Sequence, residues 1–187
     1  MKQYQTRKVC LKRFYLCNHL YFVTTVTEDR NQIFIDEGNI MVLLDTIKES
    51  LSSYAVKLHA FVILPDHLHL LVTPTMEKFT ISDFMKGIKG KSAIEINRCR
   101  HEFIRAKAKG TVKTVSTNDN TKTRIWQHQF LDHVVRDEED YRKHIEYIHN
   151  NPVKHNLCKE PWEYRWSSYR YYMNNEDVIV QIDKLPL

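Results

Sequence analysis

The chain contains few cysteines, and their spacing excludes two kinds of small scaffold. Its four cysteines are Cys10, Cys17, Cys99 and Cys158, and no two of them form a Cys-x-x-Cys pair. Zinc knuckles need such pairs, and disulfide frameworks are typical of short, cysteine-rich secreted chains. We therefore expect reduced thiols in a cytoplasmic protein.

Long apolar runs are also missing from the sequence. No signal-peptide pattern opens the chain, and no apolar segment approaches the ~20 residues that a membrane-spanning helix needs. We expect a soluble, intracellular protein with no membrane partner. With 42% hydrophobic residues in a length of 187, the chain has the size of one domain and can bury a core.

The net charge is only +5, but it is distributed unevenly along the chain. Residues 86–124 contain eleven lysines and arginines against three acidic residues, and residues 1–30 contain six against two. Residues 31–85 and 125–187 each carry net negative charge. Concentrated basic charge indicates a nucleic-acid partner, because neutralised phosphates release counterions.

Two histidines separated by one leucine begin the apolar segment that ends at Val72. They follow a Pro-Asp turn, and strand side chains alternate faces, so His67 and His69 are predicted to point the same way. Imidazole is the commonest metal-binding side chain, which makes this pair a candidate metal site. The alternative is that both rings simply lie on an exposed face of a sheet.

A helix is predicted between the acidic run at residues 137–140 and Pro152. Acidic residues favour the positive end of a helix, and proline is a stop signal, so the helix should span roughly three to four turns. Residues four and three apart form the stripe that should face the core, namely Tyr141, Ile145 and Ile148.

Tyr147 lies off this stripe, on a polar face with Lys143 one turn before it and Asn151 one turn after it. Such a tyrosine either packs under a neighbouring loop or acts as a nucleophile. A divalent metal on His67 and His69, with the Asn151 side-chain oxygen as a third ligand, would polarise a phosphodiester for attack by the phenol.

Several basic and aromatic residues are candidates for DNA contacts. Lys86, Lys89 and Lys91 cluster with two glycines, where the backbone can approach a DNA strand closely. Aromatic side chains can stack on unpaired bases, or they can instead pack against the domain. The remaining candidates are Arg13, Trp126, Phe130, Arg136, Lys143 and Arg165.

The hydrophobic patterns predict an alternation of strands and helices. In chain order we expect strand 19–27, helix 36–53, strands 57–64 and 67–73, helix 80–105 and strand 127–135. This is the βαββαβ order of a ferredoxin-like α+β sandwich, with an antiparallel sheet and helices on one face. On this layout the two histidines lie on a central strand, and the tyrosine helix can cross beside them.

The order of these motifs resembles a known family. The run from Leu64 to Leu71 looks like the His-hydrophobic-His motif of the single-tyrosine HUH transposases. The run from Tyr147 to Lys154, followed by Trp-Ser-Ser-Tyr at residues 166–169, resembles the REP-associated tyrosine transposases of bacteria. Supporting likeness occurs at residues 21–25 and 125–130, so the resemblance extends from about residue 13 to about residue 172.

The resemblance implies cleavage and rejoining of single-stranded DNA beside hairpins, through a bond between Tyr147 and a DNA 5′ phosphate. It also implies that His67, His69 and Asn151 hold Mg²⁺ or Mn²⁺. Asn151 stands where the insertion-sequence relatives, which are more mobile as DNA elements, have glutamine, whose side chain is longer. Asp66 stands where many relatives have Asn or Glu, and since it precedes the ligands we expect it to matter little.

As a whole, residues 1–187 are then expected to form a single transposase domain, acting as a monomer or a homodimer. Residues 106–123 are polar, lack a hydrophobic period and are predicted to form a mobile loop. Residues 153–187 are expected to form a C-terminal extension.

Two other classes of function keep part of this pattern. A hairpin-binding module that has lost cleavage would keep the basic segments but bind metal poorly. A metallohydrolase with an activated water at His67 and His69 would not need Tyr147.

Overall fold

A computed structural model describes residues 15–109, 123–174 and 180–184. This part of the chain contains a four-stranded sheet made of β1 (Tyr21–Val26), β2 (Val56–Leu64), β3 (His67–Pro74) and β4 (Leu131–Val134). The strand order is β2-β3-β1-β4, and all neighbouring strands are antiparallel. The histidine strand β3 is therefore a central strand, as predicted.

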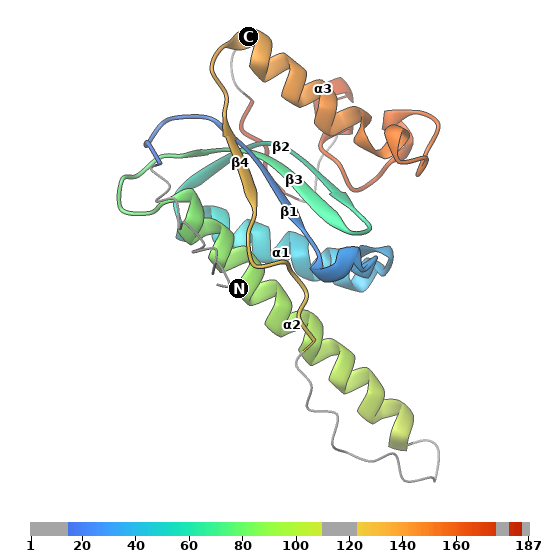
Figure 1. The fold of residues 1–187 in the computed structure, drawn as a ribbon. Helices are drawn as coiled ribbons and strands as arrows, with labels where there is room; N and C mark the ends of the chain where they lie inside the picture. Colours follow the sequence, from blue (N-terminus) through green and yellow to red (C-terminus); the bar gives the residue numbers. More distant parts are fainter. Residues whose placement is uncertain (1–14, 110–122, 175–179, 185–187) are drawn as a thin grey trace, which may run out of the picture.

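Helices cover both faces of the sheet (Figure 1). Helices α1 (Glu37–Ser53) and α2 (Ile81–Lys109) lie on one face, and α3 (Glu138–Lys154) crosses the other. Short elements complete the description, namely η1 (Glu28–Arg30), η2 (Ile33–Ile35), η3 (Pro161–Glu163) and α4 (Tyr169–Asn174). From β1 to β4 the order is βαββαβ with both connecting helices on one face, which confirms the predicted fold class. The tyrosine helix α3 is an addition on the opposite face.

Carboxylates fix the starts of two of the helices that cover the sheet, α1 and α3. Asp36 caps α1, where its side chain accepts a hydrogen bond from the Asn39 N–H at 3.2 Å. Asp137 caps α3 in the same way, accepting from the Asp140 N–H at 2.9 Å. Each contact satisfies an amide that the first helical turn leaves unpaired.

Side-chain alternation along the strands separates two apolar layers. On one face, Leu68, Leu70 and Val72 join the larger core together with residues of α1 and α2. On the other face, Leu71 joins a smaller cluster with Tyr141 and Ile148 of α3. Since His67 and His69 have the same parity as Leu71, they lie on the face that α3 crosses.

Pro152 does not end α3, contrary to the sequence prediction. It lies inside the last turn, and the helix reaches Lys154. A proline removes one helical N–H donor, but hydrogen bonds continue around it. The His155 N–H donates to the Asn151 carbonyl at 3.0 Å, and the Leu157 N–H donates to the Pro152 carbonyl at 2.9 Å.

Two other boundaries also differ from the prediction. Helix α2 runs to Lys109, four residues into the segment assigned to a loop, and residues 110–122 lie outside the described part. Strand β4 covers Leu131–Val134 rather than residues 127–135, and Trp126 instead forms an isolated bridge with Thr27. Among the described residues, the helices are all too short or too polar to cross a membrane.

Candidate active site

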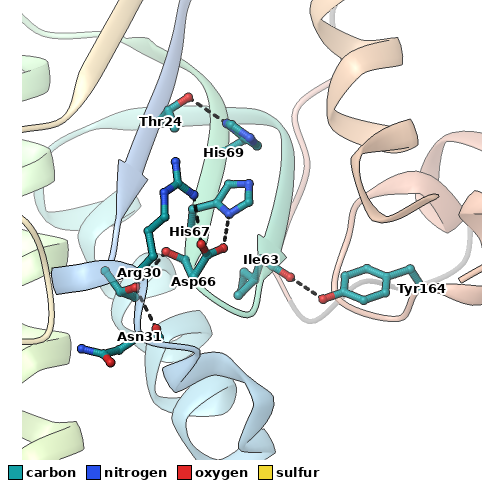
Figure 2. A network of polar contacts seen from close by, with 9 residues as sticks. Thr24, Arg30, Asn31, Ile63, Asp66, His67, His69 and Tyr164 are labelled. Atoms are coloured by element: carbon teal, nitrogen blue, oxygen red, sulfur yellow. Dashed lines mark hydrogen bonds and ion pairs between the residues drawn. The ribbon is translucent and has the colours of Figure 1, made fainter. Parts of the chain in front are cut away.

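His67 begins β3, and the turn before it orients its ring. Its Nδ1 donates a hydrogen bond to the Asp66 carboxylate at 2.5 Å, and Arg30 donates to the same carboxylate at 3.0 Å (Figure 2). Partial burial opposes ionisation of Asp66, but the contacts with His67 and Arg30 outweigh it and lower its pKa. With Nδ1 occupied as a donor, Nε2 of His67 is the nitrogen with a free lone pair. Asp66, which the sequence analysis expects to matter little, thus contacts a candidate ligand directly.

The His69 ring is held from the neighbouring strand β1. The Thr24 hydroxyl is hydrogen-bonded to its Nδ1 at 2.8 Å (Figure 2), and the Phe22 ring stacks on it at a centroid distance of 5.3 Å. Its Nε2 is buried and has no hydrogen-bond partner. Burial, followed by the neighbouring His67 and His155, lowers the pKa of His69 to about 3. The ring is neutral at physiological pH, and Nε2 can serve as a ligand atom.

The two rings form a compact pair, as the strand pattern predicts. Their centroids lie 5.0 Å apart with planes at 84°, and both residues are buried. The register of the sheet places Thr24 opposite His69 and Val26 opposite His67, so β1 supports both positions. A central strand held on both sides gives the pair a rigid base.

Tyr147 lies on α3 with its ring against the His69 ring, at a centroid distance of 5.3 Å. Phe22 meets it edge to face at 5.8 Å, and Lys154 Nζ lies 5.4 Å from the centroid of the tyrosine ring. Tyr147 is 40% exposed, in contrast to the buried residues Tyr141 and Ile148 of the same helix. It is therefore reachable from solvent beside the histidine pair.

Asn151, one turn after Tyr147, is 1% exposed, and neither atom of its side-chain amide has a hydrogen-bond partner. An unsatisfied buried polar group costs about 1–3 kcal/mol, so such a group needs a reason. Asn151 and Tyr147 also line a hollow of about 270 Å³ together with Lys143, Glu146, Asn150 and Lys154. The unpaired Oδ1 of Asn151 and Nε2 of His69 are the kinds of atom that bind a divalent cation.

His155 also belongs to this region, although no pattern in the sequence indicates it. Its ring centroid lies 5.1 Å from that of His67. Partial burial and the nearby His67 lower its pKa. The two histidines meet because α3 crosses the sheet over the start of β3, and no sequence spacing encodes that crossing.

The predicted lysines lie on α2, across the sheet from Tyr147 (Figure 1). Lys89 Nζ donates to three backbone carbonyls of residues 127–129 and so ties α2 to the segment before β4. Lys91 pairs with Glu49 of α1 at 3.6 Å, and Lys86 is exposed. Gly87 lies against the Tyr54 ring, so its small size serves helix packing. These positions are not brought together with the tyrosine.

The two residues predicted to stack on DNA bases are buried in the core. Trp126 is 4% exposed and donates through Nε1 to the Ser92 hydroxyl at 2.9 Å, and Phe130 is also buried. Aromatic residues beside basic ones have the same sequence appearance in a core as on a nucleic-acid surface. Burial, which depends on α2, decides between the two.

The other predicted contact residues lie at the surface or outside the described part. Lys143 pairs with Glu139 one turn before it at 2.6 Å. Arg165 lies 3.9 Å from Glu37 and over the Trp166 ring at 4.7 Å. Arg136 is exposed, and Arg13 lies outside the described residues.

The Trp-Ser-Ser run fastens the C-terminal part to the edge strand β2. The Ile63 N–H donates to the Trp166 carbonyl at 2.9 Å, and the Ser168 N–H donates to the Phe61 carbonyl at 3.0 Å. The Tyr164 hydroxyl donates to the Ile63 carbonyl at 2.8 Å (Figure 2), and burial raises the pKa of this tyrosine. The Ser168 hydroxyl also bonds to His149 of α3 at 3.0 Å, which joins helix, strand and extension.

Acid should destabilise the fold through His149. Burial lowers its pKa to about 4, below the value near 6.5 expected in the unfolded chain. As the pH falls through 6.5 the unfolded chain gains a proton that the folded state refuses until about 4, so stability is lost in this window, up to about 3 kcal/mol. In urea titrations, His149→Gln should show a shallower fall in the free energy of unfolding across this range. Equal pH dependence in the two proteins would contradict this assignment.

A second group of potential ligands lies near the start of α3. His133, Asp140 and His144 place their ligand atoms within 4.8 Å of one another. None of these three residues was a sequence candidate, because β4 and α3 must pack together before they meet.

The sequence profile of the family described as "Transposase IS200 like" matches residues 15–151. The chain belongs to this family. The match includes the whole βαββαβ core, both histidines and Tyr147, and it ends at Asn151. The candidate site residues on this face of the sheet up to Asn151 therefore lie in the region that matches the IS200-like transposase family.

Comparison with individual relatives of this IS200-like transposase points to a narrower group of similar proteins. A Haemophilus influenzae protein assigned to the REP-associated tyrosine transposases is 28% identical over 151 residues, covering 80% of this chain and 79% of the relative. The Escherichia coli REP-associated tyrosine transposase is 25% identical over 158 residues, covering 84% and 81%. A solved structure of a REP-associated tyrosine transposase bound to a REP hairpin matches with a TM-score of 0.66 at 22% identity, covering 100% of this chain and 94% of that chain. This last likeness establishes the shared fold.

Proposed function

We propose that this protein cleaves and rejoins single-stranded DNA beside hairpins, with Tyr147 as the nucleophile and a divalent cation held by His67, His69 and Asn151. One observation carries the proposal. The exposed Tyr147 ring lies against His69, whose buried Nε2 lacks a partner, and one turn from Asn151, whose buried amide also lacks one. A nucleophile and unsatisfied ligand atoms thus share one face of the sheet.

The three candidate ligands fit Mg²⁺ or Mn²⁺ in a catalytic setting. They offer two ring nitrogens and one amide oxygen, which leaves coordination positions for phosphate oxygens and water. When bound, the cation would polarise the scissile phosphate and offset negative charge on the leaving oxygen. Two nitrogen ligands favour Mn²⁺ over the harder Mg²⁺, which prefers oxygen.

In the proposed reaction, the phosphoryl group is transferred from the DNA 3′ oxygen to Tyr147. The Tyr147 oxygen loses its proton and bonds to phosphorus, the bond to the DNA 3′ oxygen breaks, and that oxygen takes up a proton. The product is a 5′-phosphotyrosine and a free 3′ hydroxyl. Attack by a 3′ hydroxyl on the phosphotyrosine reverses these changes, rejoins DNA and frees the tyrosine.

Hairpin DNA as the partner is supported by the solved relative, which is bound to a REP hairpin. Within this chain, Lys143 and Lys154 line the hollow beside Tyr147. Lys143 is paired with Glu139, and Lys154 supplies positive charge where a phosphate would approach. Lys154 is exposed and lies over the tyrosine ring. Lys86 and Lys91, on the other side of the sheet, would contact more distant DNA.

Detection of a covalent adduct between the protein and DNA tests the proposed function. The protein is incubated with Mn²⁺ and a labelled hairpin oligonucleotide that carries a single-stranded flank, and the mixture is then denatured in detergent. We expect a labelled protein band that is absent when EDTA is added. Binding without an adduct would favour a hairpin-binding module that has lost cleavage, and cleavage without an adduct would favour a metallohydrolase.

Asp66 should act on the site through His67. We expect Asp66→Asn to weaken Mn²⁺ binding by roughly 10–100-fold, the usual cost of losing an outer partner of a metal-bound histidine. The amide is close to the carboxylate in size, so the fold should survive. Isothermal titration with Mn²⁺ measures the effect, and Asp132→Asn, on the edge strand β4, is a control expected to bind normally. Unchanged Mn²⁺ affinity in Asp66→Asn would mean that Asp66 serves only the structure of the turn before β3.

A further inference from the structure

A group of side chains at the start of α3 has the composition of a second metal site. His133 comes from β4, whereas Asp140 and His144 come from α3, and their ligand atoms lie within 4.8 Å of one another. His133 Nε2 lies 2.9 Å from one oxygen of Asp140, and His144 Nε2 lies 3.6 Å from the other. The two rings are nearly perpendicular, with centroids 5.1 Å apart.

Ring contacts hold His144 in place, but they leave one of its nitrogens without a hydrogen-bond partner in the described chain. Its Nε2 is buried and has no hydrogen-bond partner, since 3.6 Å is too long for one. An imidazole whose unpaired nitrogen faces a carboxylate and a second imidazole at these distances is arranged as one member of a set of metal ligands.

We propose that His133, Asp140 and His144 form a second metal site that binds Zn²⁺ and clamps the tyrosine helix to the edge strand β4. Two imidazoles and one carboxylate are a common ligand set for zinc, with the fourth position left to water. His133 and Asp140 are partly exposed, so an ion can enter from solvent. Binding requires the tautomer of His133 that carries its proton on Nδ1, so that the lone pair of Nε2 faces the ion.

This site shares no residue with the proposed catalytic set and does not depend on the proposed function. It is connected to it through Phe22, whose ring stacks on His144 at 4.4 Å and on His69 at 5.3 Å. His144 is also one turn before Tyr147 on α3. A clamp between β4 and α3 would therefore fix the helix turn that presents the nucleophile.

The experiment uses the full chain with His67→Ala and His69→Ala, so that metal bound by the catalytic pair does not interfere. Isothermal titration with Zn²⁺ should give one equivalent, and Co²⁺ should give visible absorption of a nitrogen- and oxygen-liganded ion. Adding His144→Gln should weaken Zn²⁺ binding by more than the ~10–100-fold that loss of an outer partner causes. His155→Gln, placed just after the same helix, is the matched control and should leave binding unchanged.

Wild-type protein provides an arm that needs no variant. Crystals soaked in Zn²⁺ and measured at the zinc absorption edge should show an anomalous peak between His133, Asp140 and His144. A peak confined to His67 and His69 would overturn the proposal. Failure of the His67→Ala/His69→Ala protein to bind Zn²⁺, or equal binding after His144→Gln, would overturn it as well. None of these readouts involves DNA, so a failed DNA-cleavage assay has no bearing on them.

Discussion

Tyr147→Phe is expected to abolish the covalent DNA adduct while leaving folding and hairpin binding nearly intact. The change removes only the attacking oxygen. In the described part of the chain that hydroxyl makes no hydrogen bond, and the ring contacts with His69 and Phe22 are kept by phenylalanine. The free energy of unfolding should change by less than about 0.5 kcal/mol, as for most substitutions at exposed positions.

The adduct is measured with labelled hairpin DNA on a denaturing gel, and binding is measured on a native gel. Tyr141→Phe is the matched control, since it removes the same oxygen from the same helix. Tyr141 is buried, its hydroxyl lies 3.2 Å from that of Tyr172, and its loss should leave the adduct in place. An adduct that persists in Tyr147→Phe would assign the nucleophile to another residue, with Tyr141 the next to examine.

Local geometry accounts for what the sequence predicts well. The common face of His67 and His69 follows from strand alternation, and the start of α3 follows from a capping aspartate; neither needs knowledge of the rest of the fold. The exposed position of Tyr147 follows from the helical repeat in the same way. The order of strands and helices then leaves the ferredoxin-like sandwich as the matching fold.

Contacts between distant segments are not predictable in this way. Arg30 and Asp66 are 36 residues apart and meet because the end of β1 lies beside the turn before β3. Trp126 has basic and aromatic neighbours in sequence, which suit DNA stacking, but α2 covers it. In the sequence, His133 and His144 look like unrelated polar residues. They meet only because α3 packs on the sheet beside the edge strand β4. The sequence specifies each side chain, but it does not show which helices and strands cross in the fold and so which side chains become partners.

Removing the histidine pair should have the other large effect. We expect His67→Ala/His69→Ala to abolish DNA cleavage and to remove Mn²⁺ binding at this site, because Asn151 alone offers one neutral oxygen and cannot hold the ion. Hairpin binding should survive, since the proposed DNA contacts are basic side chains outside the pair, such as Lys154. Loss of cleavage with retained binding separates the chemistry from recognition.

The metal measurement needs two precautions. The His133, Asp140 and His144 group can also take a divalent ion, so Mn²⁺ titrations are compared in a His144→Gln background, where one fewer site competes. Both histidines are buried, and circular dichroism must show that the double variant is folded. Thr24→Val is the matched control, because it removes the hydrogen bond to His69 Nδ1 but keeps the ligand atom Nε2. Thr24→Val should weaken Mn²⁺ binding without abolishing it. If the double variant still binds Mn²⁺ as tightly as the protein with both histidines, His67 and His69 do not hold the cation.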